Sequence, residues 1–223
     1  MNLKKMGAAE LERCVQKKLQ QLSNHSGNKA LGEKLVVNQQ LELAPFKAIP
    51  FSGWGDWEQD PLNNRSWQWR LNWLSFLSYL MAYHRASGDE AVLDFSREAI
   101  QSWLDTYLET DTSYPFEFIW HDHATALRAE QLVLFAYYCR EHAPEWASKH
   151  AELLTYLEQA LVVHGEWLVK DSFYSYKANQ VEPSQVLRVI FKGRSGLCVT
   201  TRFSFALAEE WVAPAPSGTP PPE

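Results

Sequence analysis

The most regular pattern in the chain is a run of apolar positions at helical spacing from Trp67 to Ala86, which contains neither glycine nor proline. Leucines and aromatic residues cover two neighbouring faces of this segment, so the pattern predicts a helix packed between other helices. Gly88 can adopt the left-handed backbone conformation that commonly ends such a helix. Asp89 is placed to cap a second predicted helix over 90–109.

The pattern continues with further helices of similar length. A third is predicted over about 123–142, and a fourth begins at Pro144, because proline fits the first turn of a helix. A fifth helical start is predicted at Glu182, where Pro183 and Ser184 precede Val186, Leu187 and Ile190. Helices joined by short turns predict an all-α fold of antiparallel helical hairpins: a bundle, a toroid or a solenoid.

The two ends of the chain differ from this middle part, so three regions are predicted. Residues 1–45 form a polar lead-in with one short helix near 8–23, which a turn cluster at 23–28 should end. Residues 46–192 hold the helical hairpins. Residues 193–223 combine a strand-like alternation from 197 to 207 with a proline-rich tail that should be disordered. This change of pattern suggests a truncated or altered reading frame.

Composition and charge narrow the class of protein. The 223 residues carry 21 Lys and Arg against 27 Asp and Glu, a net charge of −6, which argues against a nucleic-acid partner. The chain has no apolar run long enough to span a membrane and no apolar signal-peptide core, so the expectation is a cytoplasmic protein without membrane contact. Cys14, Cys139 and Cys198 form no paired motif, so neither a zinc knuckle nor a disulfide framework is indicated.

One candidate binding site lies in the tryptophan-rich segment 65–73. Trp69 and Trp73 are four residues apart and share a helix face, with Arg70 beside them and Asn72 in the same turn. Indole rings stack on sugar rings, and an arginine fork binds carboxylates or sulfates. The alternative is a tryptophan-rich core whose arginine extends to water.

A second candidate is the segment from Trp120 to Arg128. His121 and His123 flank Asp122, but adjacent helical residues point apart and no third ligand is obvious, so no metal is predicted. The simplest interpretation of Asp122 is a helix N-cap. Arg128 could be structural or could face a cleft.

A third candidate is the polar segment 171–182, which contains Tyr174, Tyr176 and Asn179. Amides and phenols at a helix start can bind anions, but an ordinary capped turn explains the same residues.

Together these segments resemble the N-terminal helical domain of the heparinase II/III-like and alginate-lyase-like polysaccharide lyases. The likeness covers Arg65 to about Gln185, a little over half the chain. It rests on motifs in family order: Arg70-Leu71-Asn72-Trp73, the segment Trp120–Arg128, and His164-Gly165-Glu166-Trp167-Leu168 leading to Asn179.

The resemblance implies an (α/α) toroid followed by a β-sandwich domain, acting on acidic polysaccharides by β-elimination without a cofactor. The proton beside a uronate carboxylate becomes removable once that carboxylate's charge is neutralised, and a tyrosine or histidine then removes it. Asn179 matches the neutralising asparagine, although Gln180-Val181 stands where the family has His-Gly. The family's catalytic tyrosine lies further along, beyond the part that this chain matches, so Tyr174 and Tyr176 are only stand-in candidates for it.

The resulting expectation is weak binding of an acidic polysaccharide with little or no cleavage. Exposed apolar helix faces of an incomplete toroid should favour self-association. The expected substrate-binding residues are Trp69, Arg70, Asn72, Trp73, Trp120, Asp122, His123 and Arg128.

Two alternatives remain open. A toroidal inverting glycoside hydrolase would use paired carboxylates such as Glu117 and Asp122, separated by a sugar-sized gap. A non-enzymatic α-solenoid would bind a protein partner on a concave face and would not bind glycans.

Overall fold

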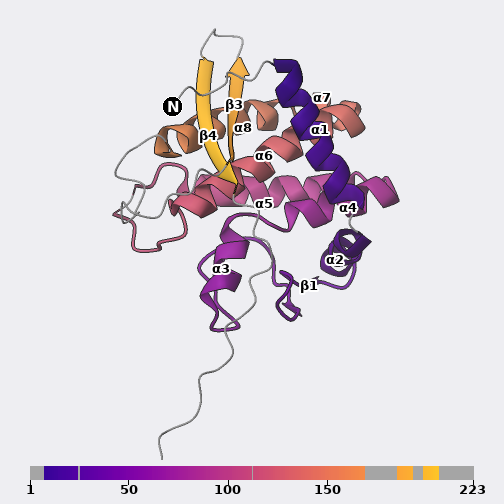
Figure 1. Ribbon diagram of the computed structural model, residues 1–223. Coiled ribbons are helices and arrows are strands. Elements are labelled where there is room, and N and C mark those ends of the chain that lie inside the picture. The colour runs from indigo at the N-terminus through magenta and orange to yellow at the C-terminus, as the bar shows by residue number, and fades with distance from the viewer. Residues whose placement is uncertain (1–7, 25, 112, 169–184, 193–197, 206–223) are drawn as a thin grey trace, which may run out of the picture.

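A computed structural model describes residues 8–24, 26–111, 113–168, 185–192 and 198–205, and this part of the chain is predominantly helical (Figure 1). The mostly helical fold predicted from the sequence is therefore confirmed. The helices are α1 (Ala8–Asn24), α2 (Ser26–Val36), α3 (Arg65–Asn72), α4 (Leu77–Ser87), α5 (Ala91–Tyr107), α6 (Asp122–His142), α7 (Pro144–Lys149) and α8 (Ala151–Leu168). The strands are β1 (Gln40–Leu41), β2 (Ile49–Pro50), β3 (Gln185–Lys192) and β4 (Cys198–Phe205).

Several predicted helix boundaries are confirmed. The helix expected near 8–23 is α1, and those expected over 90–109 and 123–142 are α5 and α6. Gly88 ends α4 in the left-handed conformation with φ +70°, and its N–H donates to the carbonyl of His84. Asp89 accepts a hydrogen bond from the backbone N–H of Ala91, but the N-cap of α5 is Glu90, so the cap position predicted for Asp89 is off by one residue.

The single helix predicted from Trp67 to Ala86 is wrong, because the structure divides it into α3 and α4. The chain turns between Asn72 and Leu77, and Leu74 has a positive φ of 59°. In a continuous helix the carbonyl of Asn72 would accept from the residue four positions later. Here it accepts from Arg128 Nη1 at 2.8 Å, so a tertiary contact takes the place of the helical hydrogen bond.

The turn cluster predicted at 23–28 does not end the helical part of the lead-in, because Ser23 and Asn24 belong to α1 and Ser26 to Asn28 belong to α2. α2 begins at Ser26 and packs closely on α4. A Cβ atom added to Gly32 would lie 2.3 Å from the carbonyl oxygen of Tyr79 and 2.7 Å from the Cβ of Tyr83. Only glycine allows the two helices to approach this closely.

The helical start predicted at Glu182 is also wrong where the structure describes it, because residues 185–192 form β3. β3 pairs with β4 in an antiparallel register from Gln185 opposite Phe205 to Lys192 opposite Cys198. The strand predicted from 197 to 207 is thus confirmed by β4. Its partner is β3, the segment for which a helix was predicted. Val186, Val189 and Ile190 are β-branched and favour a strand, and a short apolar run does not distinguish strand from helix.

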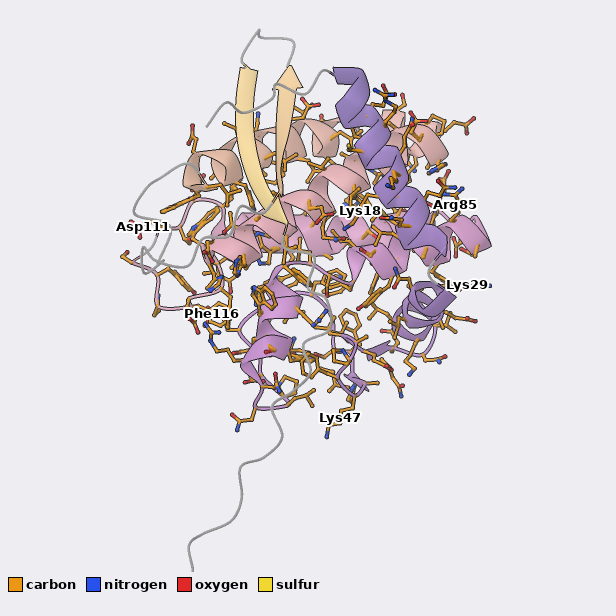
Figure 2. The ribbon with its side chains drawn as sticks, in the orientation of Figure 1. Lys18, Lys29, Lys47, Arg85, Asp111 and Phe116 are labelled. Atoms are coloured by element: carbon orange, nitrogen blue, oxygen red, sulfur yellow. The ribbon has the colours of Figure 1, made fainter. Side chains whose placement is uncertain are left out.

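One apolar core joins α1 and α2 to the later helices. Val15, Leu19 and Leu35 belong to the same cluster of buried side chains as Trp103 and Leu157. In Figure 1, α5, α6 and α8 lie across the centre, α1 crosses in front of them, and the β3–β4 hairpin runs against α8. Lysine and arginine side chains such as Lys29, Lys47 and Arg85 project from the surface (Figure 2).

The helices that the structure describes include none that combines the length and apolar character needed to cross a membrane. Their arrangement into a toroid stays a prediction.

Candidate ligand-binding face

The candidate site lies where α3 meets the start of α6. Asn64 caps α3, and its side chain accepts hydrogen bonds from the N–H groups of Ser66 and Trp67 at 3.0 and 3.1 Å. This cap determines where α3 begins. Residues spaced by four positions from Arg65 then lie on one side of the helix. Trp69 is therefore placed one turn beyond Arg65, and Trp73 follows at the C-terminal end.

Trp69 and Trp73 form a stacked pair at the surface. Their ring centroids are 4.9 Å apart with an interplanar angle of 27°. The guanidinium of Arg70 lies 5.5 Å from the Trp73 ring, and the His123 ring lies 6.5 Å from Trp69. The first three side chains are half-buried and His123 is exposed. We call Trp69, Arg70, Trp73 and His123 the indole face.

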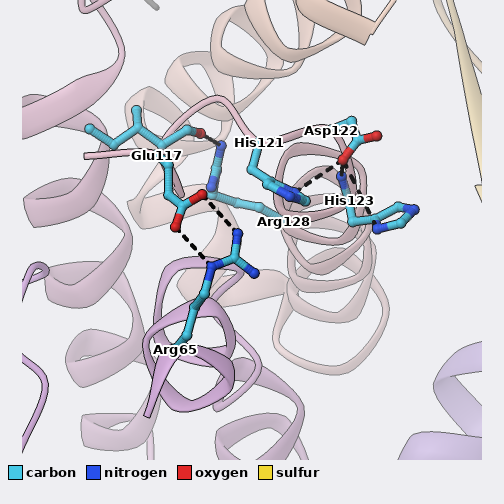
Figure 3. A network of polar contacts seen from close by, with 7 residues as sticks. Arg65, Glu117, His121, Asp122, His123 and Arg128 are labelled. Atoms are coloured by element: carbon cyan, nitrogen blue, oxygen red, sulfur yellow. Dashed lines mark hydrogen bonds and ion pairs between the residues drawn. The ribbon is translucent and has the colours of Figure 1, made fainter. Parts of the chain in front are cut away.

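Arg70 contributes a positive charge to the indole face. Within the part of the chain that the structure describes, it has no carboxylate at ion-pair distance, and its cation is directed at the Trp73 ring. The neighbouring Arg65 differs, because its Nε and Nη2 donate to the two carboxylate oxygens of Glu117 at 2.8 and 2.7 Å (Figure 3). Of these two arginines, Arg70 is the one able to bind an external anion.

The Arg65–Glu117 pair bears on the hydrolase alternative. Hydrogen bonds from Arg65 hold the pKa of the Glu117 carboxyl below its usual range, and Glu117 is exposed. A general acid in a glycoside hydrolase needs a raised pKa. Glu117 is therefore ionised at neutral pH and is poorly suited to that role.

Arg128 lies in the core beneath the indole face. Its side chain is fully buried, its Nη1 and Nη2 donate to the carbonyls of Asn72 and Ile119, and its Nε donates to Nε2 of His164 at 2.8 Å. The guanidinium also lies 3.7 Å from the ring centroid of Trp103. Among the described residues, each hydrogen bond of this cation goes to a neutral acceptor.

Asn72 and Trp120 are buried next to Arg128. The Asn72 amide donates to the carbonyls of Trp57 and Gln68 and accepts from Trp103 Nε1, and Trp120 Nε1 donates to the carbonyl of Thr110. Asn72 and Arg128 are inaccessible, and Trp120 is 6% exposed. We assign these three to the framework that supports the face, in place of the ligand contacts predicted from the sequence.

Three residues with metal-ligating side chains lie at the start of α6. His121 Nδ1 is 3.1 Å from Asp122 Oδ1, and His123 Nδ1 is 4.0 Å from the same oxygen (Figure 3). The N-cap is His121 in an extended conformation (φ −67°, ψ 133°), so the cap position predicted for Asp122 is off by one residue. Burial lowers the pKa of His121, which keeps its imidazole neutral at neutral pH.

The placement of these three side chains explains why no metal site is predicted from the sequence. Adjacent residues inside a helix diverge, but His121 precedes the first helical turn and is free of that constraint. Its side chain therefore turns toward Asp122. The only sequence clue is that an N-cap position could fall on His121.

The predicted catalytic residues Asn179, Tyr174 and Tyr176 lie in 169–184, outside the described residues. The structure thus brings Trp69, Arg70, Trp73, Asp122 and His123 to one region. It does not test the prediction of the catalytic residues.

Comparison of the chain with protein-family models, with curated proteins and with solved structures gave no match. The resemblance to polysaccharide lyases therefore rests on the motif residues alone.

Proposed function

We propose that the indole face binds an acidic, uronate-containing polysaccharide. The observation that carries this proposal is Arg70, a cation without a carboxylate partner in the described part of the chain, beside the stacked pair Trp69 and Trp73. A sugar ring can lie on an indole while its carboxylate accepts hydrogen bonds from the guanidinium. The two contacts together distinguish an acidic sugar from a neutral one.

The net charge of −6 sets a condition on this interaction. A polyanion is repelled by the molecule as a whole, so binding depends on cationic groups at the point of contact. Arg70 supplies such a charge on the indole face. Binding should therefore be weak, sensitive to salt and confined to this face.

The chemistry proposed with this binding is β-elimination, as in the lyases that the sequence resembles. Asn179 would neutralise the uronate carboxylate, and Tyr174 or Tyr176 would remove the adjacent proton. Because Gln180 replaces the family's histidine, the proposal is binding with little or no cleavage. We further propose that the helical hairpins form part of an (α/α) toroid.

The test compares binding of heparan sulfate, alginate and hyaluronate oligosaccharides by calorimetry. Trp69→Ala and Trp73→Ala should each weaken binding about tenfold or more, because a well-placed aromatic contact contributes roughly 2 kcal/mol. Tyr137→Ala is the matched control. This half-buried aromatic on α6 lies 14 residues beyond His123, about 21 Å along the helix.

Two outcomes would overturn the proposal: no binding of any of the three glycans, or equal losses in Trp69→Ala and Tyr137→Ala. Ultraviolet absorbance of unsaturated uronate, followed in the same samples, measures cleavage. A strong signal would contradict the expectation of little activity. Binding of a protein partner with no glycan binding would favour the α-solenoid alternative.

A further inference from the structure

The start of α6 gathers three side chains that metal ions commonly use. His121, Asp122 and His123 each offer one ligand atom, and these atoms all lie within 4.8 Å of one another. We propose that they form a binding site for a divalent transition-metal ion, with Zn²⁺ as the probe. This inference does not depend on glycan binding, because the metal alone is the ligand.

The separations between these atoms are close to those of a tetrahedral zinc site. Zinc bonds to nitrogen and oxygen of roughly 2.0–2.1 Å place neighbouring tetrahedral ligands about 3.4 Å apart. The observed distances from Asp122 Oδ1 are 3.1 Å to His121 Nδ1 and 4.0 Å to His123 Nδ1. All three ligand atoms lie within 4.8 Å of one another, so the proposal requires side-chain rotations that shorten the longer separations.

The local structure holds the central carboxylate in place. Asp122 Oδ1 accepts a hydrogen bond from the backbone N–H of His123 at 2.7 Å, and the Asp122 side chain is only 10% exposed. His121 Nδ1 is buried and has no hydrogen-bond partner of acceptable geometry among the described residues. This buried nitrogen faces Asp122, so a cation between the two would satisfy both (Figure 3).

Access and charge also favour a cation. His123 is 57% exposed, so an ion can enter from solvent on that side. The nearby charge of Arg65 is matched by Glu117, which leaves the Asp122 carboxylate as the excess charge of the cluster. Two imidazoles and one carboxylate suit Zn²⁺ and similar ions better than Mg²⁺ or Ca²⁺, which prefer oxygen ligands.

Three protein ligands leave at least one coordination position open. That position would take water or the oxygen of an anionic ligand. The His123 ring is 6.5 Å from Trp69, so the ion would lie at the margin of the indole face. This placement would add a positive charge beside Arg70.

The experiment uses the full chain without a histidine tag, stripped with a chelator and titrated with Zn²⁺ against a chromophoric competitor. We expect one ion per chain, and Co²⁺ should give the visible absorption of a four-coordinate nitrogen and oxygen site. His123→Ala and Asp122→Asn should each weaken Zn²⁺ binding about tenfold or more. His142→Ala, an exposed histidine at the other end of α6, should leave it unchanged.

Three results would overturn the proposal: no Zn²⁺ binding in the micromolar range, equal affinity in His123→Ala and the unaltered chain, or loss of binding in His142→Ala. Because His123 is exposed, its alanine variant should fold, and circular dichroism verifies this. A protein that binds Zn²⁺ but no glycan would support the metal site and refute the proposed function. A protein that binds glycans but no Zn²⁺ would refute the metal site and leave the proposed function intact.

Discussion

Arg128 Nε donates a hydrogen bond to His164 Nε2 across 2.8 Å in the interior of the helical core. His164 can accept it only as the neutral tautomer with its proton on Nδ1, which donates to the carbonyl of Ala160 at 2.7 Å. The contact joins α6 to α8, and the other two nitrogens of the guanidinium bind Asn72 and Ile119. One buried cation thus connects the break after α3, the segment before α6, and α8.

The first prediction concerns Arg128→Met. The change leaves the carbonyls of Asn72 and Ile119 and one nitrogen of His164 buried without a donor, so we expect the free energy of unfolding to fall by about 3 kcal/mol or more. Arg128→Lys should recover only part of the loss, because an ammonium cannot reproduce the planar fork. Urea unfolding followed by tryptophan fluorescence measures both.

The control for Arg128 is Arg140→Met, on the same helix. Arg140 forms an exposed ion pair with Glu158, and such pairs contribute about 1 kcal/mol or less. Equal losses in Arg128→Met and Arg140→Met would show that the buried network adds no stability.

The second prediction is an acid sensitivity that comes from His164. Burial, with a smaller contribution from the Arg128 charge, lowers the pKa of His164 to about 3 from an unfolded value of 6.5. The unfolded chain therefore binds a proton that the native state excludes between these values, so stability is complete above pH 6.5 and falls as the pH decreases toward 3. The loss from this group approaches about 1.4 kcal/mol per pH unit.

His164→Gln tests this acid sensitivity. Glutamine keeps an acceptor for Arg128 and does not titrate, so its stability should depend less on pH between 6.5 and 4 than that of the unaltered chain. The measurement is urea unfolding at several pH values. Identical pH dependence in the two proteins would assign the effect to other groups.

The third prediction concerns the contact between α2 and α4. In Gly32→Ala the new methyl group meets the backbone oxygen of Tyr79 at 2.3 Å, and a backbone atom cannot move aside cheaply. We expect a loss of about 1–3 kcal/mol despite the better helix propensity of alanine. Thermal unfolding measures it, with Ala30→Gly, an exposed position in the same helix, as the reference for propensity alone. A Gly32→Ala variant more stable than the unaltered chain would disprove this packing.

The fourth prediction is that Glu117→Gln strengthens the binding of acidic glycans. The change releases Arg65, one helical turn before Trp69, from its carboxylate partner. An additional exposed cation should improve affinity by roughly twofold to fivefold, and the gain should disappear at high salt. Calorimetry at two salt concentrations measures this. Weaker binding would instead favour a direct role for Glu117, as the hydrolase alternative requires.

Local features of the fold could be predicted from the sequence because their causes are local. The left-handed cap at Gly88 and the start of α7 at Pro144 follow from the chemistry of single residues. The break between Asn72 and Leu77 could not be predicted, because the group that binds the freed carbonyl of Asn72 is Arg128, 56 residues later in the chain. Helical periodicity continues through the break and conceals it.

The site was predictable to the same extent. Helical spacing predicts Trp69 and Trp73 on one face, and in the structure their rings lie 4.9 Å apart. Burial of Arg128 was not predictable from the sequence. The helical pattern is the same whether the guanidinium contacts solvent or donates to two carbonyls and one imidazole. The approach of His121 to Asp122 depends on which residue caps α6, and a shift of one residue changes it.

Arg70 provides the most direct test of the proposed recognition of acidic sugars. Calorimetry should compare the unaltered chain with Arg70→Gln on two ligands, a uronate oligosaccharide and the same oligosaccharide with its carboxyl groups reduced to alcohols. Arg140→Gln, 17 residues beyond His123 on α6, is the matched control. We predict that Arg70→Gln weakens binding of the uronate ligand about tenfold and has no effect on binding of the reduced ligand. Arg140→Gln should leave the binding of both ligands unchanged. Equal affinity of Arg70→Gln and the unaltered chain for the uronate ligand would contradict the account.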